Sequence, residues 1–78
     1  MATGKQGCYD DADSALRKCH EQVNQAHITE IAKANAIQDD DAKQAALKDA
    51  QDRMIEGYKV CEQAHTDEIA ACDATYPD

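Results

Sequence analysis

The sequence lacks phenylalanine and tryptophan, and its only proline, Pro77, is the penultimate residue. Without such bulky side chains, a chain of 78 residues has little apolar surface to bury, and domains this small usually need an additional constraint to stay folded. No stretch approaches the roughly 18 consecutive apolar residues of a membrane span, and no apolar segment of the signal-peptide kind precedes the domain. We therefore expect one small domain, residues 1–78, without a membrane span.

Positive charge is also scarce. Eight lysine and arginine residues stand against sixteen aspartate and glutamate residues, which gives a formal net charge of −8. A surface of this sign repels the phosphates of nucleic acids and of anionic lipids. The composition therefore argues against a nucleic-acid partner.

The abundant residues are mostly good helix formers. Alanine, glutamine, lysine, glutamate and aspartate fill the chain between Gly7 and Pro77, and no segment alternates apolar and polar residues as a half-buried strand does. This composition predicts an all-α fold. We expect a first helix at about residues 7–38 and a second at about 41–75.

A run of three aspartates, Asp39, Asp40 and Asp41, is the one local break in the helical pattern. Aspartate is unfavourable inside a helix and favourable at its N-cap, and Asp41 followed by Gln44 resembles a capping box. We therefore place a turn near Asp39–Asp41. The alternative is that the run is a solvated stretch of one uninterrupted helix, because it contains neither glycine nor proline.

The four cysteines form two pairs with equal spacing. Cys8 and Cys19 are eleven residues apart, and so are Cys61 and Cys72. Eleven helical residues make about three turns, so both members of a pair share one helix face but lie about 16 Å apart, beyond the roughly 7 Å limit for the Cα atoms of a disulfide. Bridges within one helix are therefore excluded.

Residue numbers decide between the two connectivities that remain. Facing residues in an antiparallel hairpin have numbers with a constant total; Cys8 with Cys72 gives 80, and Cys19 with Cys61 also gives 80. The other choice gives 69 and 91, which no single register satisfies. Half of 80 places the turn at Asp40, where the capping signals independently place it. The sequence thus predicts an antiparallel two-helix hairpin stapled by two disulfides, Cys8–Cys72 and Cys19–Cys61.

Two alternatives for the cysteines follow from the same spacing. An unbroken helix that pairs with a second copy would satisfy the same totals between chains. A zinc site would need four ligands at about 2.0 to 2.3 Å from one ion, which cysteines three turns apart cannot provide.

Disulfides indicate an oxidising compartment. We therefore expect an extracytoplasmic protein, periplasmic or secreted, in its mature form without a signal peptide.

In layout, paired cysteines on two antiparallel helices resemble the twin Cx9C proteins of the mitochondrial intermembrane space and the α-hairpinin peptides. The resemblance covers only the four cysteines. Here ten residues separate the members of each pair, and 41 residues separate Cys19 from Cys61, a longer connection than in either family. The resemblance implies the mitochondrial intermembrane space as an alternative location.

Few residues combine into a recognisable chemical site. His20 and His27 lie on one side of the first helix, either as a ligand pair or as residues that flank the seam. Glu62 and His65 have the Glu-x-x-His spacing of di-iron helical bundles, but the facing segment of the first helix offers no carboxylate to complete such a site. No nucleophile and base stand out as a pair, and no glycine loop could bind phosphate. We expect no enzyme activity and no cofactor, with Glu62 and His65 as weak candidates for a metal.

Successive residues are about 100° apart around a helix axis, and this angle assigns the apolar residues of each helix to two surfaces, a seam and a second surface beside it. The residues nearest the cysteines form the expected seam: Ala12, Ala15, Val23, Ala26 and Ile37 on the first helix, and Ala50, Met54, Gly57 and His65 on the second. In the register of the cysteines, Gly57 faces Val23. A further set is rotated toward one side of both helices, and we call it the front face: Tyr9, Leu16, His20, His27, Ile31, Leu47, Ile55, Tyr58, Ile69 and Tyr76. The opposite side, the back face, is mostly polar: Asp11, Lys18, Gln22, Gln25, Arg53, Glu56 and Asp67.

The front face leads to three functional hypotheses. The first is a protein-binding module of the inhibitor or adaptor type, since contiguous exposed apolar surfaces usually mark binding sites. The second is a self-assembling structural subunit, a homodimer that forms a four-helix bundle or a larger array. The third is a helical protein that binds a metal or a small ligand through its histidines and carboxylates.

Overall fold

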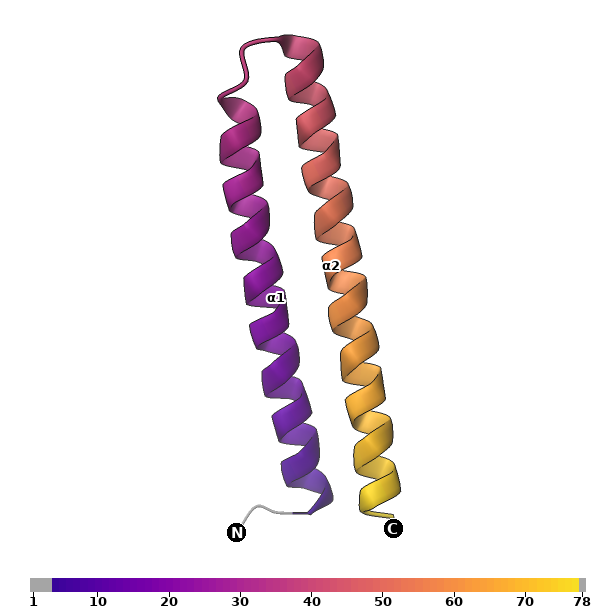
Figure 1. Ribbon diagram of the computed structural model, residues 1–78. Helices are drawn as coiled ribbons and strands as arrows, with labels where there is room; N and C mark the ends of the chain where they lie inside the picture. Colours follow the sequence, from indigo (N-terminus) through magenta and orange to yellow (C-terminus); the bar gives the residue numbers. More distant parts are fainter. Residues whose placement is uncertain (1–3, 78) are drawn as a thin grey trace.

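The computed structural model describes residues 4–77, which form two long helices and the link between them. Helix α1 spans Lys5–Asn35 and helix α2 spans Asp40–Thr75. The described residues are 91% helical and form no strand, and the two helices run antiparallel with both termini at the same end (Figure 1). The prediction of an all-α hairpin is confirmed.

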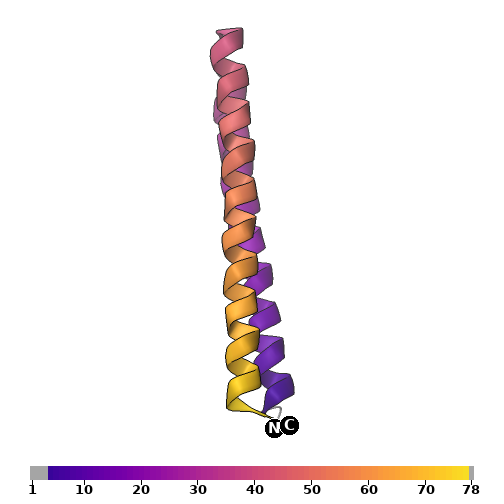
Figure 2. The same cartoon turned by 90° about the vertical axis from the view of Figure 1, so that its right-hand side faces the viewer.

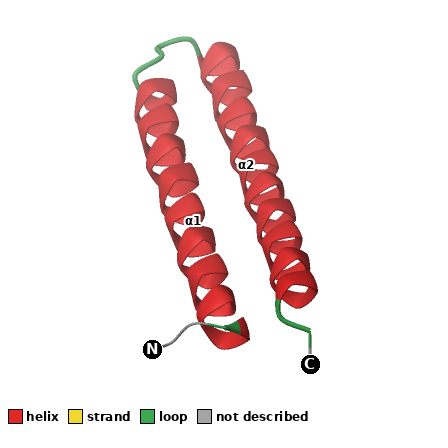
Figure 3. Ribbon diagram, turned by 60° about the horizontal axis from the view of Figure 1, so that its bottom comes forward, coloured by secondary structure: helices red, strands yellow, loops and turns green. Residues whose placement is uncertain are grey.

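The link is longer than the sequence suggested, and it begins earlier in the chain. Figure 3 shows one loop between the helices, formed by residues 36–39. Helix α1 ends at Asn35 rather than near residue 38, because the amides of Ala36 and Ile37 bond to the carbonyls of Lys33 and Ala34. Such bonds three residues apart tighten the last turn and stop the helix. The break excludes one uninterrupted helix.

The start of α2 depends on a different aspartate than expected. Asp39 has an extended backbone, and its carboxylate accepts a hydrogen bond from the Ala42 amide at 3.0 Å. The N-cap is therefore Asp39, and the expectation of a capping box at Asp41 is wrong. Asp40 and Asp41 lie in the first turn, where their negative charge interacts favourably with the helix dipole.

Two disulfides join the helices in the register obtained from the cysteine numbers. Cys8 bonds to Cys72 and Cys19 bonds to Cys61, each with a Cα–Cα distance of 5.7 Å. Both bridges lie within one chain, so the alternatives of interchain pairing and of zinc thiolates are excluded. Both lie in the half of the hairpin that carries the termini, and the half near the turn has no covalent link.

Small residues make up the buried core. Among the described residues, the buried ones are Ala12, Ala34, Ala50, Cys61 and Cys72. No leucine, isoleucine, valine or methionine of residues 4–77 is buried, because two helices alone cover only one side of each other. The hydrophobic contribution to stability is therefore small, and the disulfides provide much of the stability of the hairpin.

The seam on α1 is rotated from the cysteine stripe. Cys8 and Cys19 are only half-buried, whereas their partners on α2 are buried. Ala15 and Ala26, which we expected in the seam, are exposed, and Ala34 is buried instead. The centre of the seam on α1 therefore lies toward the front face.

The hairpin is long and only one layer thick. Its extents between Cα atoms are 58 × 19 × 8 Å. In Figure 1 the helices lie side by side, and after a quarter turn α2 largely covers α1 (Figure 2). No helix among the described residues is long and apolar enough to cross a membrane. Two broad faces of the hairpin remain open to contact.

Candidate functional site

The structure places the front face beside the seam, where its residues are only partly covered. Eight of the ten front-face residues are half-buried, while Ile55 and Tyr76 are 43% and 39% exposed. Ile55, Tyr58 and Glu62 line one shallow hollow of this face. The front face is thus a surface that one hairpin covers incompletely.

Six of these residues form three regularly spaced pairs, which we call the ladder. On α1, Tyr9, His20 and Ile31 follow one another at intervals of eleven residues; on α2, Leu47, Tyr58 and Ile69 do the same. The middle pair, His20 and Tyr58, is in contact, and the pairs Tyr9/Ile69 and Ile31/Leu47 have residue numbers with the same total of 78. Eleven residues are about 16 Å of helix, so the pairs stand at equal distances along the hairpin. The cysteines of each helix are separated by the same interval of eleven residues.

The middle pair of the ladder carries an aromatic contact and a carboxylate. The rings of His20 and Tyr58 meet edge to face, with centroids 5.1 Å apart and an interplanar angle of 85°. His20 Nε2 is shielded from water and lies 3.3 Å from Glu62 Oε1, although the geometry is not that of a hydrogen bond. An edge-to-face contact of this kind stabilises the folded state by more than the burial of its apolar surface alone. His20 is therefore held between two residues of α2.

Two more polar pairs cross the front face. His65 Nε2 lies 2.8 Å from Asp13 Oδ1, within hydrogen-bond distance. The expectation that the facing segment of the first helix offers no carboxylate there is therefore wrong. The Tyr9 hydroxyl donates a hydrogen bond to Asp73, and Lys5 Nζ lies 3.7 Å from the same carboxylate. The hydrogen bond to Asp73 raises the pKa of Tyr9 above its ordinary value, because ionisation would remove the donor and place two negative charges together.

The residues considered as metal ligands are directed to different partners. Glu62 contacts His20 and His65 contacts Asp13, so the two do not converge on one point. Residues 4–77 contain no group of three or more histidine, cysteine, aspartate or glutamate side chains that could hold a metal ion. His27 also points away from His20's partners, since its Nδ1 lies 3.3 Å from the carbonyl oxygen of Ala50. Each of the three histidines thus contacts a residue of the opposite helix.

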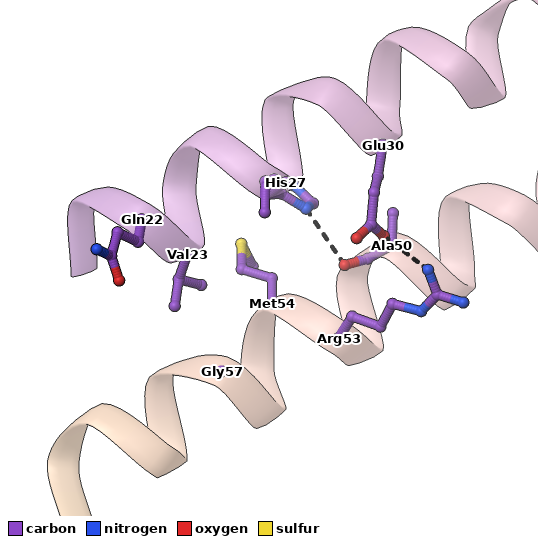
Figure 4. A pocket seen from close by; sticks show the side chains of 9 residues that line it. Gln22, Val23, His27, Glu30, Ala50, Arg53, Met54 and Gly57 are labelled. Carbon is purple, nitrogen blue, oxygen red and sulfur yellow. Dashed lines mark hydrogen bonds and ion pairs between the residues drawn. The ribbon is translucent and has the colours of Figure 1, made fainter. Parts of the chain in front are cut away.

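A second hollow, which the sequence did not suggest, lies toward the back face near the middle of the hairpin (Figure 4). It measures about 270 Å³, and Gln22 and Arg53 of the back face line it together with Val23, His27 and Met54. Figure 4 shows the Glu30 carboxylate and the Arg53 guanidinium meeting at one end, 3.5 Å apart. Its lining also includes residues with small or no side chains: Ala26, Ala50 and Gly57.

This hollow has a structural cause. A Cβ atom added at Gly57 would lie 2.9 Å from Val23 Cγ2, so the helices approach each other there as closely as a glycine allows. The predicted pairing of Gly57 with Val23 is confirmed. Small residues that permit a close approach of the helices also leave empty space beside the contact. The packing of the helices therefore explains this hollow without a ligand.

Comparison with known proteins adds no assignment. The chain matches no protein-family model, and it has no significant similarity to a curated protein or to a solved structure.

Proposed function

We propose that this chain is a small, non-enzymatic protein-binding module, of the inhibitor or adaptor type, that uses its front face. The observation that carries the proposal is the ladder of half-buried apolar residues on a hairpin only one layer thick. Such pairs remain in partial contact with water unless another protein covers them, and aromatic residues such as Tyr58 commonly anchor protein interfaces.

The rigidity of the hairpin supports the same proposal. Two disulfides constrain the relative position of α1 and α2, and polar contacts such as His65 with Asp13 cross the front face. A surface that is already ordered loses little conformational entropy when it binds. The ladder is therefore a preorganised surface.

The cysteines support a location in an oxidising compartment. Two disulfides within the chain are consistent with an oxidising environment. We place the module outside the cytoplasm, in a periplasm or in secretions, with the mitochondrial intermembrane space as the alternative.

Site-specific photo-crosslinking tests the proposal. A benzophenone amino acid replaces Ile55 on the front face or, as the control, the exposed Gln25 on the back face, and each protein is irradiated in extracytoplasmic extract of the native host. We expect protein adducts, to itself or to another protein, from position 55 and few from position 25. Equal yields from both positions, or no adduct from position 55, would refute the proposal.

A paired variant tests whether these residues bind rather than hold the fold. Leu16→Ser with Tyr58→Ser should leave helicity and both disulfides intact, because the seam and the bridges remain, and should abolish the adducts. Lys18→Ser with Gln25→Ser is the matched control. If the front variant unfolds the oxidised hairpin, these residues are core and the proposal fails.

A further inference from the structure

We infer that the partner of the front face is a second copy of this chain, bound antiparallel about a two-fold axis that passes through the His20–Tyr58 pair. This inference rests on the proposed function and names its partner. Two hairpins packed in this way would form a four-helix bundle with the ladder at its centre.

Equal spacing makes the ladder complementary to itself. A two-fold axis that lies in the plane of the face and runs across the helices reverses the hairpin end to end. The middle pair then meets its own copy, and each outer pair meets the other outer pair of the partner. Because both intervals are eleven residues, all three pairs coincide after the reversal. A two-fold interface requires this kind of self-complementarity.

The outline of the whole face is comparable in area with a standard interface. The broad face measures 58 × 19 Å between Cα atoms, or about 1,100 Å², whereas a standard interface buries about 800 Å² on each partner. The ladder occupies the middle part of this area. A second hairpin would cover it without any change of fold.

Two carboxylates beside the ladder have polar neighbours within the chain. Glu62 lies beside His20, and Asp73 accepts the hydrogen bond of Tyr9 and lies near Lys5. The charge of Asp73 is therefore partly offset by Lys5 before a second copy binds. An offset carboxylate near one end of the face is compatible with binding.

Charge also selects the antiparallel arrangement. The end with the termini, residues 4–16 and 64–77, carries six carboxylates and one lysine, Lys5, for a net charge of −5. The turn end, residues 30–50, carries five carboxylates and three lysines, for a net charge of −2. A parallel dimer would place the two acidic ends together, whereas the antiparallel one separates them.

Sedimentation equilibrium of the oxidised protein, from about one to several hundred micromolar, tests the dimer. Ile55→Ser removes an apolar side chain beside the ladder, and Val60→Ser removes one that is 60% exposed and about 140° away around α2. Because the dimer contains position 55 twice, we expect Ile55→Ser to raise the dissociation constant about 10- to 100-fold. Val60→Ser should leave it unchanged, and added salt should strengthen the dimer because it screens the net charge of −8.

Crosslinking between copies tests the arrangement. A benzophenone at position 47 should label the partner near Tyr9 and Ile69, and labelling near Ile31 instead would overturn the antiparallel axis. A dimer that Val60→Ser disperses and Ile55→Ser does not would overturn the proposed face. A protein that is monomeric at every concentration overturns the second copy as partner; adducts from position 55 to another protein would then still support the proposed function, and their absence would refute both.

Discussion

Val23 and Gly57 face each other in the seam, where the helices leave no room for a side chain at position 57. A Cβ atom added at Gly57 would lie 2.9 Å from Val23 Cγ2 and 3.1 Å from Cγ1. A valine has one strongly preferred rotamer in a helix, so it cannot turn both methyl groups away. The glycine at this position is therefore a packing requirement of the seam.

A double-mutant cycle tests this relationship. In a helix interior, Gly57→Ala would by itself stabilise by about 1 kcal/mol, but overpacking against Val23 costs about 1 to 3 kcal/mol. We expect Gly57→Ala to destabilise the wild type by up to about 2 kcal/mol and to stabilise the Val23→Ala variant by about 1 kcal/mol. Urea unfolding of the four oxidised proteins measures both values, and an equal effect in the two backgrounds would contradict the close packing.

Removal of the disulfides should unfold the hairpin. With bridges that span 42 and 64 residues, loop-closure entropy predicts roughly 7 kcal/mol for the pair and about 3 kcal/mol for either one when the other is present. A small domain has a total stability of about 5 to 15 kcal/mol. We expect reduction to abolish most helicity by circular dichroism, and Cys19→Ser with Cys61→Ser to remain folded at a lower urea midpoint. Unchanged helicity after complete reduction would show that the small core suffices.

The N-cap of α2 can be assigned by two substitutions in the same aspartate run. Asp39→Ala removes the acceptor of the Ala42 amide and should destabilise by about 1 kcal/mol. Asp41→Ala removes only a favourable charge in the first turn and should cost less than half of that. Urea midpoints of the two variants give the comparison, and a larger effect at Asp41 would restore the capping box that the sequence suggested.

Alkaline pH should weaken the contact between Tyr9 and Asp73. The folded state raises the pKa of Tyr9 above 10.0 through its hydrogen bond to Asp73, so the contact stabilises fully below pH 10 and is lost as the pH rises through the folded-state pKa. We expect Tyr9→Phe to lower the urea midpoint at pH 8 and no longer to lower it once Tyr9 is ionised, because Asp73 repels the ionised tyrosine. Carbon-13 NMR of the labelled tyrosine ring should show a lower pKa for Tyr9 in the Asp73→Asn variant, and an unchanged value would contradict the hydrogen bond.

The sequence by itself determined the all-α class and the antiparallel register in which its cysteines pair, but not that both helices and both bridges belong to one chain. The equal spacing of Cys8 with Cys19 and of Cys61 with Cys72 excluded bridges within a helix, and the constant total of facing residue numbers left one connectivity. These arguments depend only on helical rise and rotation, which are nearly the same in every helix. The approximate position of the turn and the pairing of Val23 with Gly57 followed from the same register.

Only the tertiary structure decided the details of the seam and of the front face. Three neighbouring aspartates have the same capping propensity, so the backbone at Asp39, and not its residue type, made it the cap. The exposure of Ala15 and Ala26 and the burial of Ala34 depend on how far α1 is rotated against α2, which the disulfides constrain but do not fix. The contacts of the histidines also depend on that rotation. Successive residues are about 100° apart around a helix, which is too coarse for the sequence to show whether a side chain lies in the seam or beside it.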